Sequence, residues 1–252
     1  MKKLILLIFI PLVSFGQTAI TDDNIFDAVG LWDSNQTDAE AEYGHISIWD
    51  TSNVTNMSNL FFDFQDFNED IGNWDVSNVT DMSYMFHFAI DFDKDISNWN
   101  VSNVTNMEGM FKHAMNFSNG VNPYALNNWD VSNVTNMAAM FMSAMDIGSP
   151  LSNWDVSNVT NMAAMFYNTN ISNSGVGEWD VSNVTEMGGM FYDSSSYDYL
   201  GNWDVSNVTG MSNMFNGSGI GYYHGLENWD VSSVTDMSYM FANSVISILN
   251  LE

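Results

Sequence analysis

One thirteen-residue stretch recurs through most of this chain and decides what it can fold into. Its second copy reads Trp-Asp-Val-Ser-Asn-Val-Thr-Asp-Met-Ser-Tyr-Met-Phe over residues 74–86, and the chain holds eight copies at intervals of 24 to 30 residues. The tryptophans that open the copies are Trp49, Trp74, Trp99, Trp129, Trp154, Trp179, Trp203 and Trp229. A fixed period of about 20–50 residues is typical of arrays in which each unit packs on its neighbours. The sequence therefore predicts one elongated repeat solenoid.

The chain divides into a predicted signal peptide (1–16), an N-terminal cap (17–45) and a repeat domain (46–252) that ends in a short strand. The first part has two lysines, an apolar run and a small-residue cleavage site before Gln17, which is the order of a secretory signal. The apolar run is too short to span a bilayer as a mature helix. We therefore expect a secreted, extracellular or cell-surface protein without a transmembrane span in the mature chain.

The predicted cap does not fit the repeat. Apolar residues at i, i+3, i+4 and i+7 from Ile25 predict a short helix, with Thr21 or Asp22 as its N-cap. An array of stacked repeats exposes an apolar edge at its first copy, and an amphipathic helix covers such an edge.

Each repeat is predicted to contribute one short strand. In the second copy Trp74 and Val76 are two residues apart, so they share one face of a strand over about residues 73–77. Strands that recur once per copy in the same direction pair as parallel neighbours. The tryptophans are then expected to form a structural ladder, whose interior members are Trp74, Trp99, Trp129, Trp154, Trp179 and Trp203.

A short helical turn is predicted to follow each strand. Met82, Met85 and Phe86 have the i, i+3, i+4 spacing of one helix face, and Thr80 stands where an N-cap is expected. Methionine and phenylalanine at this spacing indicate core packing rather than a ligand site.

An asparagine stands four residues after each of the first seven tryptophans and opens an Asn-Val-Thr sequon. One interpretation is glycosylation. The other, which we favour, is a structural ladder in which inward asparagines bond the backbone of adjacent copies. The predicted ladder includes Asn78, Asn103, Asn133 and Asn158.

The chain is strongly acidic, with 4 Lys and Arg against 31 Asp and Glu and a formal net charge of −27. A nucleic-acid partner is excluded, because phosphate contacts need a basic face. Carboxylates that follow the tryptophans would form a row about 4.8 Å apart, which needs screening, hydrogen bonds or bridging cations. Calcium is the one cofactor we consider, and its candidate ligands are Asp75, Asp130, Asp155, Asp180 and Asp204.

No catalytic signature is present in the sequence, so we do not expect an enzyme. The histidines His45, His87, His113 and His224 are scattered over distant copies without a paired nucleophile motif. Variable loops on a repetitive frame are where binding usually resides. Tyrosines of two such loops are candidates for an exposed aromatic binding patch, although they serve equally well as covers of the core: Tyr197, Tyr199, Tyr222 and Tyr223.

The pattern Trp-Asp-Val-Ser-Asn-Val-Thr-x-Met-x-x-Met-Phe resembles the repeat of the BspA-like leucine-rich-repeat surface proteins, a unit also found in mycoplasma surface lipoproteins. The first copy departs from it, with Thr51 for valine and Leu60 for the second methionine, as end repeats often do. The resemblance implies a solenoid of leucine-rich-repeat type used in adhesion. The lipoprotein relatives carry an anchoring cysteine, whereas this chain has no cysteine, which leaves its attachment open.

Two functional hypotheses follow. The first is a secreted or cell-surface binding module for an extracellular protein or glycan. The second is a structural spacer or self-assembling surface-layer unit, in which the ends of the solenoid associate. An exposed aromatic patch favours the first hypothesis, and concentration-dependent end-to-end association favours the second.

Overall fold

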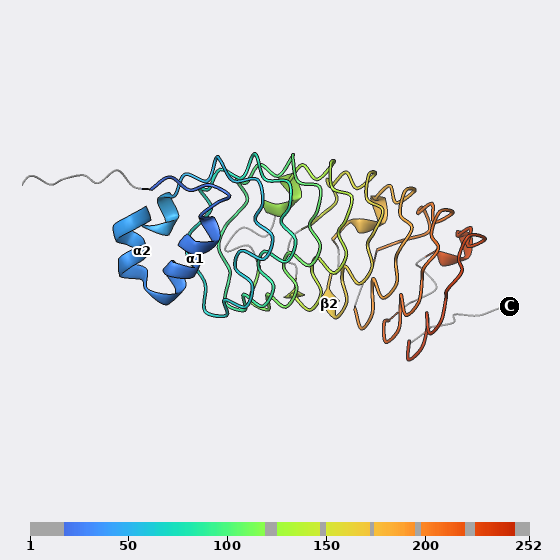
Figure 1. Cartoon of the computed structure of the whole chain (residues 1–252). Coiled ribbons are helices and arrows are strands. Elements are labelled where there is room, and N and C mark those ends of the chain that lie inside the picture. The colour runs from blue at the N-terminus through green and yellow to red at the C-terminus, as the bar shows by residue number, and fades with distance from the viewer. Residues whose placement is uncertain are drawn as a thin grey trace, which may run out of the picture.

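The computed structural model describes residues 18–118, 125–146, 150–171, 174–194, 198–219 and 225–244. The predicted signal peptide, the predicted final strand after residue 244 and three of the candidate tyrosines (Tyr197, Tyr222 and Tyr223) lie outside the described residues. The eight copies stack in chain order into an elongated body, with two helices at one end and the last copy at the other (Figure 1). No helix among the described residues has the length and apolar character needed to cross a bilayer.

The two helices close the first copy. Helix α1 (Ile25–Ser34) forms where the sequence predicts it and buries Ile25, Ala28, Val29 and Trp32, while α2 (Gln36–Tyr43) buries Ala39 and Tyr43. The residue before α1 is Asn24, so the prediction of Thr21 or Asp22 as its N-cap is wrong. Trp32 and Tyr43 both pack edge-on against Trp49 of the first copy, with ring centroids 6.1 and 5.9 Å away.

The strand predicted around each tryptophan does not form. In the second copy Asp75 accepts the N–H of Ser77, and Val79 donates its N–H to Val76, so the chain turns directly after Trp74. Isolated parallel bridges instead join residues seven positions after each tryptophan, as between Asn56 and Asp81. The regular strands among the described residues are β1 (Met145–Asp146) and β2 (Thr169–Asn170), which pair in parallel over two residues each.

Several tryptophans are preceded by a single 3-10 turn. These turns are η1 (Ile46–Ile48), η2 (Ala125–Asn128), η3 (Val176–Glu178) and η5 (Leu226–Asn228). The fold is therefore a compact repeat protein with a period of about 25 residues and little regular secondary structure.

The predicted helical turn is also wrong, although its residues do face the core. The N–H groups of Met82, Tyr84, Phe86 and Phe88 donate to carbonyls of the next copy over 2.7–3.0 Å, while the N–H of Met85 closes a turn on Met82. Tyr84 and Phe88 have positive φ angles of 55° and 61°. An i→i+3 bond with a positive φ at the third residue is the mark of a type II turn, which cannot continue as a helix.

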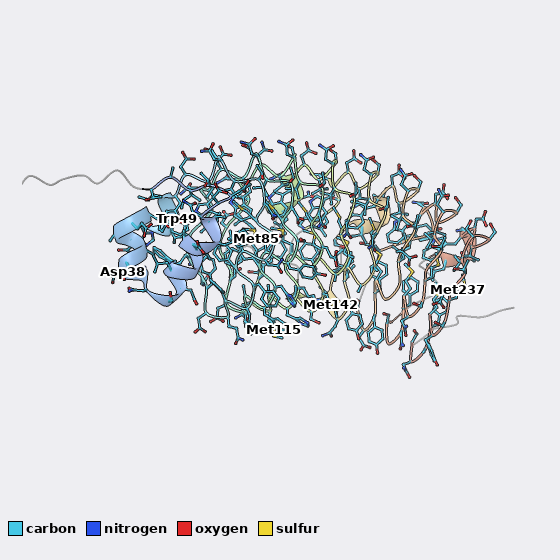
Figure 2. The ribbon with its side chains drawn as sticks, in the orientation of Figure 1. Asp38, Trp49, Met85, Met115, Met142 and Met237 are labelled. Carbon is cyan, nitrogen blue, oxygen red and sulfur yellow. The ribbon has the colours of Figure 1, made fainter. Side chains whose placement is uncertain are left out.

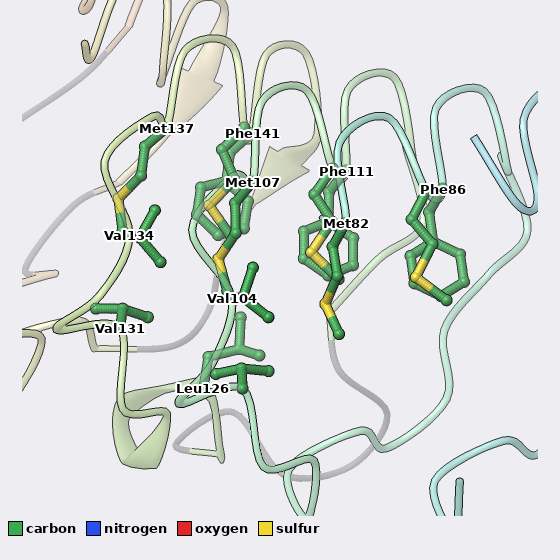
Figure 3. Packing of buried hydrophobic residues seen from close by; sticks show 14 of the residues in the cluster. Met82, Phe86, Val104, Met107, Phe111, Leu126, Val131, Val134, Met137 and Phe141 are labelled. Carbon is green, nitrogen blue, oxygen red and sulfur yellow. The ribbon is translucent and has the colours of Figure 1, made fainter. Parts of the chain in front are cut away.

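The core is a continuous aromatic and methionine stack. Phenylalanines from equivalent positions of successive copies lie parallel, with centroids 5.4–6.0 Å apart from Phe61 through Phe241. Figure 3 shows how methionines and phenylalanines recur from copy to copy within the core. Each tryptophan Nε1 donates to a backbone carbonyl of the preceding copy over 2.7–3.3 Å, as Trp154 does to Leu126. This bond satisfies the one polar atom of each buried indole.

Candidate binding surface on the turn face

Two surfaces run along the stack, the first mostly exposed and the second mostly half-buried. We call the first the ladder face; it consists of the residues one, three, four and six positions after each tryptophan, which are nearly the same in every copy. We call the second the turn face; it consists of the residues nine, ten, thirteen and fourteen positions after each tryptophan, which differ widely between copies. In copies four to seven the turn face comprises Ala138, Ala139, Met142, Ser143, Ala163, Ala164, Tyr167, Asn168, Gly188, Gly189, Tyr192, Asp193, Ser212, Asn213, Asn216 and Gly217.

The polar side chains of the ladder face form hydrogen bonds with the backbone of the stack. The Nδ2 groups of Asn78, Asn103, Asn133 and Asn158 donate to the serine carbonyl of the preceding copy over 2.6–2.8 Å. These asparagines are exposed, so the prediction that they point inward is wrong, although they do bond the adjacent copy as a ladder. Each threonine likewise donates both its N–H and its hydroxyl to the threonine carbonyl of the copy before, as Thr160 does to Thr135.

The candidate calcium ligands belong to this face as well. Asp75, Asp130, Asp155, Asp180 and Asp204 each accept the N–H of the serine two residues later over 3.0–3.2 Å. The serine hydroxyl, followed by the serine N–H, holds the carboxyl pKa of Asp75, Asp130 and Asp204 below its ordinary value. In the described parts of the chain no three Asp, Glu or His side chains come close enough to share a metal ion. In the structure these carboxylates cap turns by accepting backbone N–H groups. Calcium binding stays a prediction.

The turn face is hollowed between copies four and seven. A shallow groove of about 560 Å³, open to solvent, lies there. Met142, whose position is labelled in Figure 2, contributes to one of its walls. The lining residues are Met142, Ala163, Ala164, Tyr167, Glu186, Gly188, Gly189, Tyr192, Ser212 and Asn213, and we call this hollow the turn-face groove.

Two tyrosines form the aromatic part of the groove. Tyr167 and Tyr192 occupy equivalent positions of adjacent copies, and their rings stack with centroids 4.3 Å apart and planes 4° apart. Burial, followed by the neighbouring Tyr192, raises the pKa of Tyr167 above its ordinary value, so the Tyr167 phenol stays neutral at physiological pH. The pair presents a rigid apolar surface with hydroxyl groups at its rim.

Small residues open the groove. In copies two and three the ring of Tyr84 lies over Gly109, so close that a Cβ on Gly109 would come within 2.5 Å of it, and the Tyr84 hydroxyl donates to Glu108. Burial and this bond raise the pKa of Tyr84 to about 12. In copies five and six the equivalent positions hold Ala164 and Gly189, so no ring covers the surface there.

At the groove, Glu186 replaces the Asn or Asp that most other copies have at this position. In six copies the residue seven positions after the tryptophan is Asn or Asp, and it accepts the N–H two residues later, as Asn161 does from Ala163. Copy six has Glu186 instead, whose Oε1 accepts the hydroxyl of Thr209 over 3.1 Å. Its Oε2 lies 2.1 Å from where a Cβ on Gly210 would stand, so only glycine allows the carboxylate to lie there.

The predicted tyrosine patch does not coincide with this groove. Tyr199 is 47% exposed, but its hydroxyl accepts from Asn228 and its ring covers Gly201 and Gly225, so it packs on the loops before the tryptophans. The sequence reasoning missed Tyr167, Tyr192 and Glu186. An alignment of the eight copies would have found them, because they stand at positions where the copies disagree.

The turn face of the early copies carries an aromatic cluster instead of a hollow. The His87 ring stacks on Phe88 with centroids 4.5 Å apart and meets Phe62 edge-on at 4.9 Å. Both ring nitrogens of His87 are buried and have no hydrogen-bond partner among the described residues. Burial, with the nearby Lys112 and His113, lowers the pKa of His87 to about 4, so the ring is neutral at physiological pH.

Comparison with known proteins gives one match. A family described as "Mycoplasma protein of unknown function, DUF285" matches three overlapping stretches, residues 31–127, 118–223 and 197–247. Together these stretches cover all eight copies and the end of the N-terminal cap. No curated protein and no solved structure matches the chain.

Proposed function

Because the chain belongs to the DUF285 family of Mycoplasma proteins of unknown function, its own surface must suggest its role, and we propose that it is a secreted or cell-surface binding module. The module attaches to an extracellular protein or glycan through its turn face. The observation that carries this proposal is the turn-face groove, which lies where the side chains vary most between copies.

The contrast between the two faces supports this assignment. Side chains of the ladder face recur because each one satisfies a backbone group of its own or the preceding copy. Side chains of the turn face are free to differ, because the turns beneath them are held by backbone bonds and by the Asn or Asp seven positions after the tryptophan. A constant frame that carries a variable surface is the usual arrangement of repeat proteins that bind partners.

The sequence resemblance to BspA-like surface proteins points the same way. It suggests that the stack is a variant of the leucine-rich-repeat type, with turns in place of strands, and that the role is adhesive. Adhesion by a fold of this kind is an analogy at the level of the family, so the groove rather than the fold carries the argument.

A structural spacer or self-assembling unit is the second candidate. The observation that favours it is the last copy, where Val231, Met237, Tyr239 and Phe241 are exposed although their equivalents in interior copies are mostly buried. An apolar edge of this kind is suited to association with another stack.

The test uses residues 17–252 on a panel of immobilised extracellular-matrix proteins and an array of glycans. We expect at least one partner whose binding is lost in the turn-face variant Tyr167→Ala/Tyr192→Ala. Binding should survive the ladder-face variant Asp155→Asn, which retains the oxygen that caps its turn. If no partner binds and sedimentation shows association that grows with concentration, the spacer is the correct function.

A further inference from the structure

We propose that the turn-face groove binds a neutral saccharide, with a sugar ring packed on the Tyr167–Tyr192 wall and its hydroxyls bonded by Glu186, Ser212 and Asn213. The proposal names the ligand of the binding module and therefore rests on the proposed function. It is argued from the chemistry of the lining, its size and its charge.

The apolar wall suits the C–H face of a sugar. Tyr167 and Tyr192 are parallel within 4° and are held from behind by the stack, so they form one preorganised surface beside Met142. The C–H groups on one side of a sugar ring are apolar, so they are buried favourably against such an apolar surface. Little conformational entropy is lost on binding, because the tyrosines are already ordered by their contact with each other.

The opposite wall suits hydroxyl groups. Glu186 offers carboxylate oxygens as acceptors, Asn213 offers both an amide donor and an acceptor, and Ser212 offers a hydroxyl that serves as either. Because Gly210 leaves room for it, the Glu186 carboxylate reaches beyond its own copy and is not used to cap a turn. Sites that hydrogen-bond several hydroxyls discriminate strongly against ligands that lack them.

Size and charge narrow the choice of ligand. A hollow of about 560 Å³ has the volume of a small-molecule site rather than of a protein interface. None of the residues that line the groove is basic, and the chain carries a formal net charge of −27, so phosphates, sulfated sugars and uronic acids are repelled. A neutral sugar needs no counter-charge, and its mixed surface matches tyrosine on one side and polar groups on the other.

The groove-filling variant Ala164→Tyr gives the sharpest test. The frame already holds a tyrosine at this position in copy two, where Tyr84 lies over Gly109, and Gly189 is the equivalent of Gly109 beside Ala164. The variant therefore places a ring over the groove in a way that the stack accommodates. Phe62→Ala is the control, because it removes an exposed aromatic of the same row far from the groove.

The experiment screens residues 17–252 on an array of neutral oligosaccharides and titrates the best binder by calorimetry. We expect Ala164→Tyr to abolish binding, Tyr192→Ala to raise Kd about tenfold or more, and the Phe62→Ala control to stay within about twofold of the unaltered protein. Glu186→Gln keeps an acceptor, so a sugar should lose about threefold or less, whereas an amine bound through charge would be lost.

Three outcomes overturn the proposal. Either no neutral oligosaccharide binds, or the best one binds Ala164→Tyr as well as the unaltered protein. Spermine bound in an Ala164→Tyr-sensitive and Glu186→Gln-sensitive manner would also contradict it, because the groove would then be a cation site. If a matrix protein binds the turn face and no saccharide does, the binding module stands and only this inference fails.

Discussion

The two ends of the stack solve the same problem differently. In the first copy Trp49 is only 4% exposed, because Trp32 and Tyr43 of the helices pack on its ring and its Nε1 donates to Gly44. In the last copy Trp229 keeps its bond to Leu200, yet it is only half-buried. Figure 2 labels Trp49 beside the helices and Met237 at the opposite end, where Met237 is 39% exposed.

Burial in this fold depends on having a neighbour on both sides. Each copy presents two flat sides, and a side chain becomes fully buried only when a neighbour covers both. The cap imitates a neighbour closely. The Asp22 carboxylate accepts the N–H and hydroxyl of Thr55 at 2.7 Å each, which are the groups that the threonine carbonyl of a preceding copy accepts elsewhere. The last described copy has no such partner on its outer side among the described residues.

The largest expected effect separates interior copies from the last one. Trp154→Ala should lower the free energy of unfolding by about 3–5 kcal/mol, because it empties a fully enclosed site and leaves the Leu126 carbonyl unpaired. Trp229→Ala should cost less than Trp154→Ala, because the Trp229 indole is already partly exposed. Chemical denaturation followed by circular dichroism measures both. Equal losses would mean that another part of the molecule covers the last copy in solution.

The Asp22 carboxylate takes the place of a preceding copy at the first copy, and its removal tests this role. Asp22→Ala removes three hydrogen bonds to the first copy and, discounted for the exposure of the carboxylate, should cost about 1–2 kcal/mol. The adjacent Asp23 is exposed and is the matched control, and Asp23→Ala should change the free energy of unfolding by about 0.5 kcal/mol or less. Hydrogen exchange at the first copy should rise in the Asp22 variant alone. Protection that is unchanged in both would show that the helices close this end without Asp22.

Acid should destabilise the cap and the body of the stack in two different pH ranges. Burial of His87 lowers its pKa from 6.5 to about 4, so the unfolded chain binds the proton more readily and stability falls as pH drops from about 6.5 to 4. Lys112 and His113 add to this shift, and Asp63 opposes it. Burial raises the pKa of Asp22, but the bonds from Thr55 and Asn56 outweigh it, and its net lowered pKa places its loss of stability below pH 3.8.

Thermal unfolding measured from pH 7 to pH 3 resolves these two steps. His87→Phe continues the row that begins with Phe62 and should weaken the first step, while leaving the second in place. A smaller part of the first step should remain, because burial lowers the pKa of His113 too. Asp22→Asn should weaken the second step only. A variant without His87 that lost as much stability between pH 6.5 and 4 as the unaltered protein would assign the acid sensitivity to another group.

Much of the frame is predictable from the sequence, and most of the site is not. The period, the inward methionines and phenylalanines and the N-terminal helix follow from spacing alone, because burial is set by the pattern of apolar residues. The conformation of the backbone between these residues does not follow from their spacing. Tyr84 and Phe88 adopt positive φ, which no propensity assigns to bulky side chains, so a turn was mistaken for a helix. The groove depends on which copies carry small residues side by side, and that becomes visible only when Ala164 and Gly189 are placed in register.

The smallest expected effect tests that unusual backbone, again by comparing an interior copy with the last. Ala164 has a φ of +54°, a region in which a side chain costs about 1–2 kcal/mol relative to glycine. Ala164→Gly should therefore stabilise the protein, but by only about 0.5 kcal/mol, because glycine also adds entropy to the unfolded chain. Gly189→Ala should cost about 1 kcal/mol by strain alone, since its Cβ would lie at an ordinary 3.7 Å from the Tyr167 ring.

Tyr239 is the equivalent residue of the last copy, with a φ of +57°. Because that copy is covered on one side only, its strain can relax by local opening before the whole stack unfolds. Tyr239→Gly should then leave the midpoint of global unfolding unchanged while Ala164→Gly raises it, and high-precision calorimetry of the two variants measures the difference. If Ala164→Gly destabilised the protein, the positive φ would not be a source of strain. If Tyr239→Gly stabilised it as much as Ala164→Gly does, the last copy would be as firmly held as the interior, and the two ends would not differ as their burial indicates.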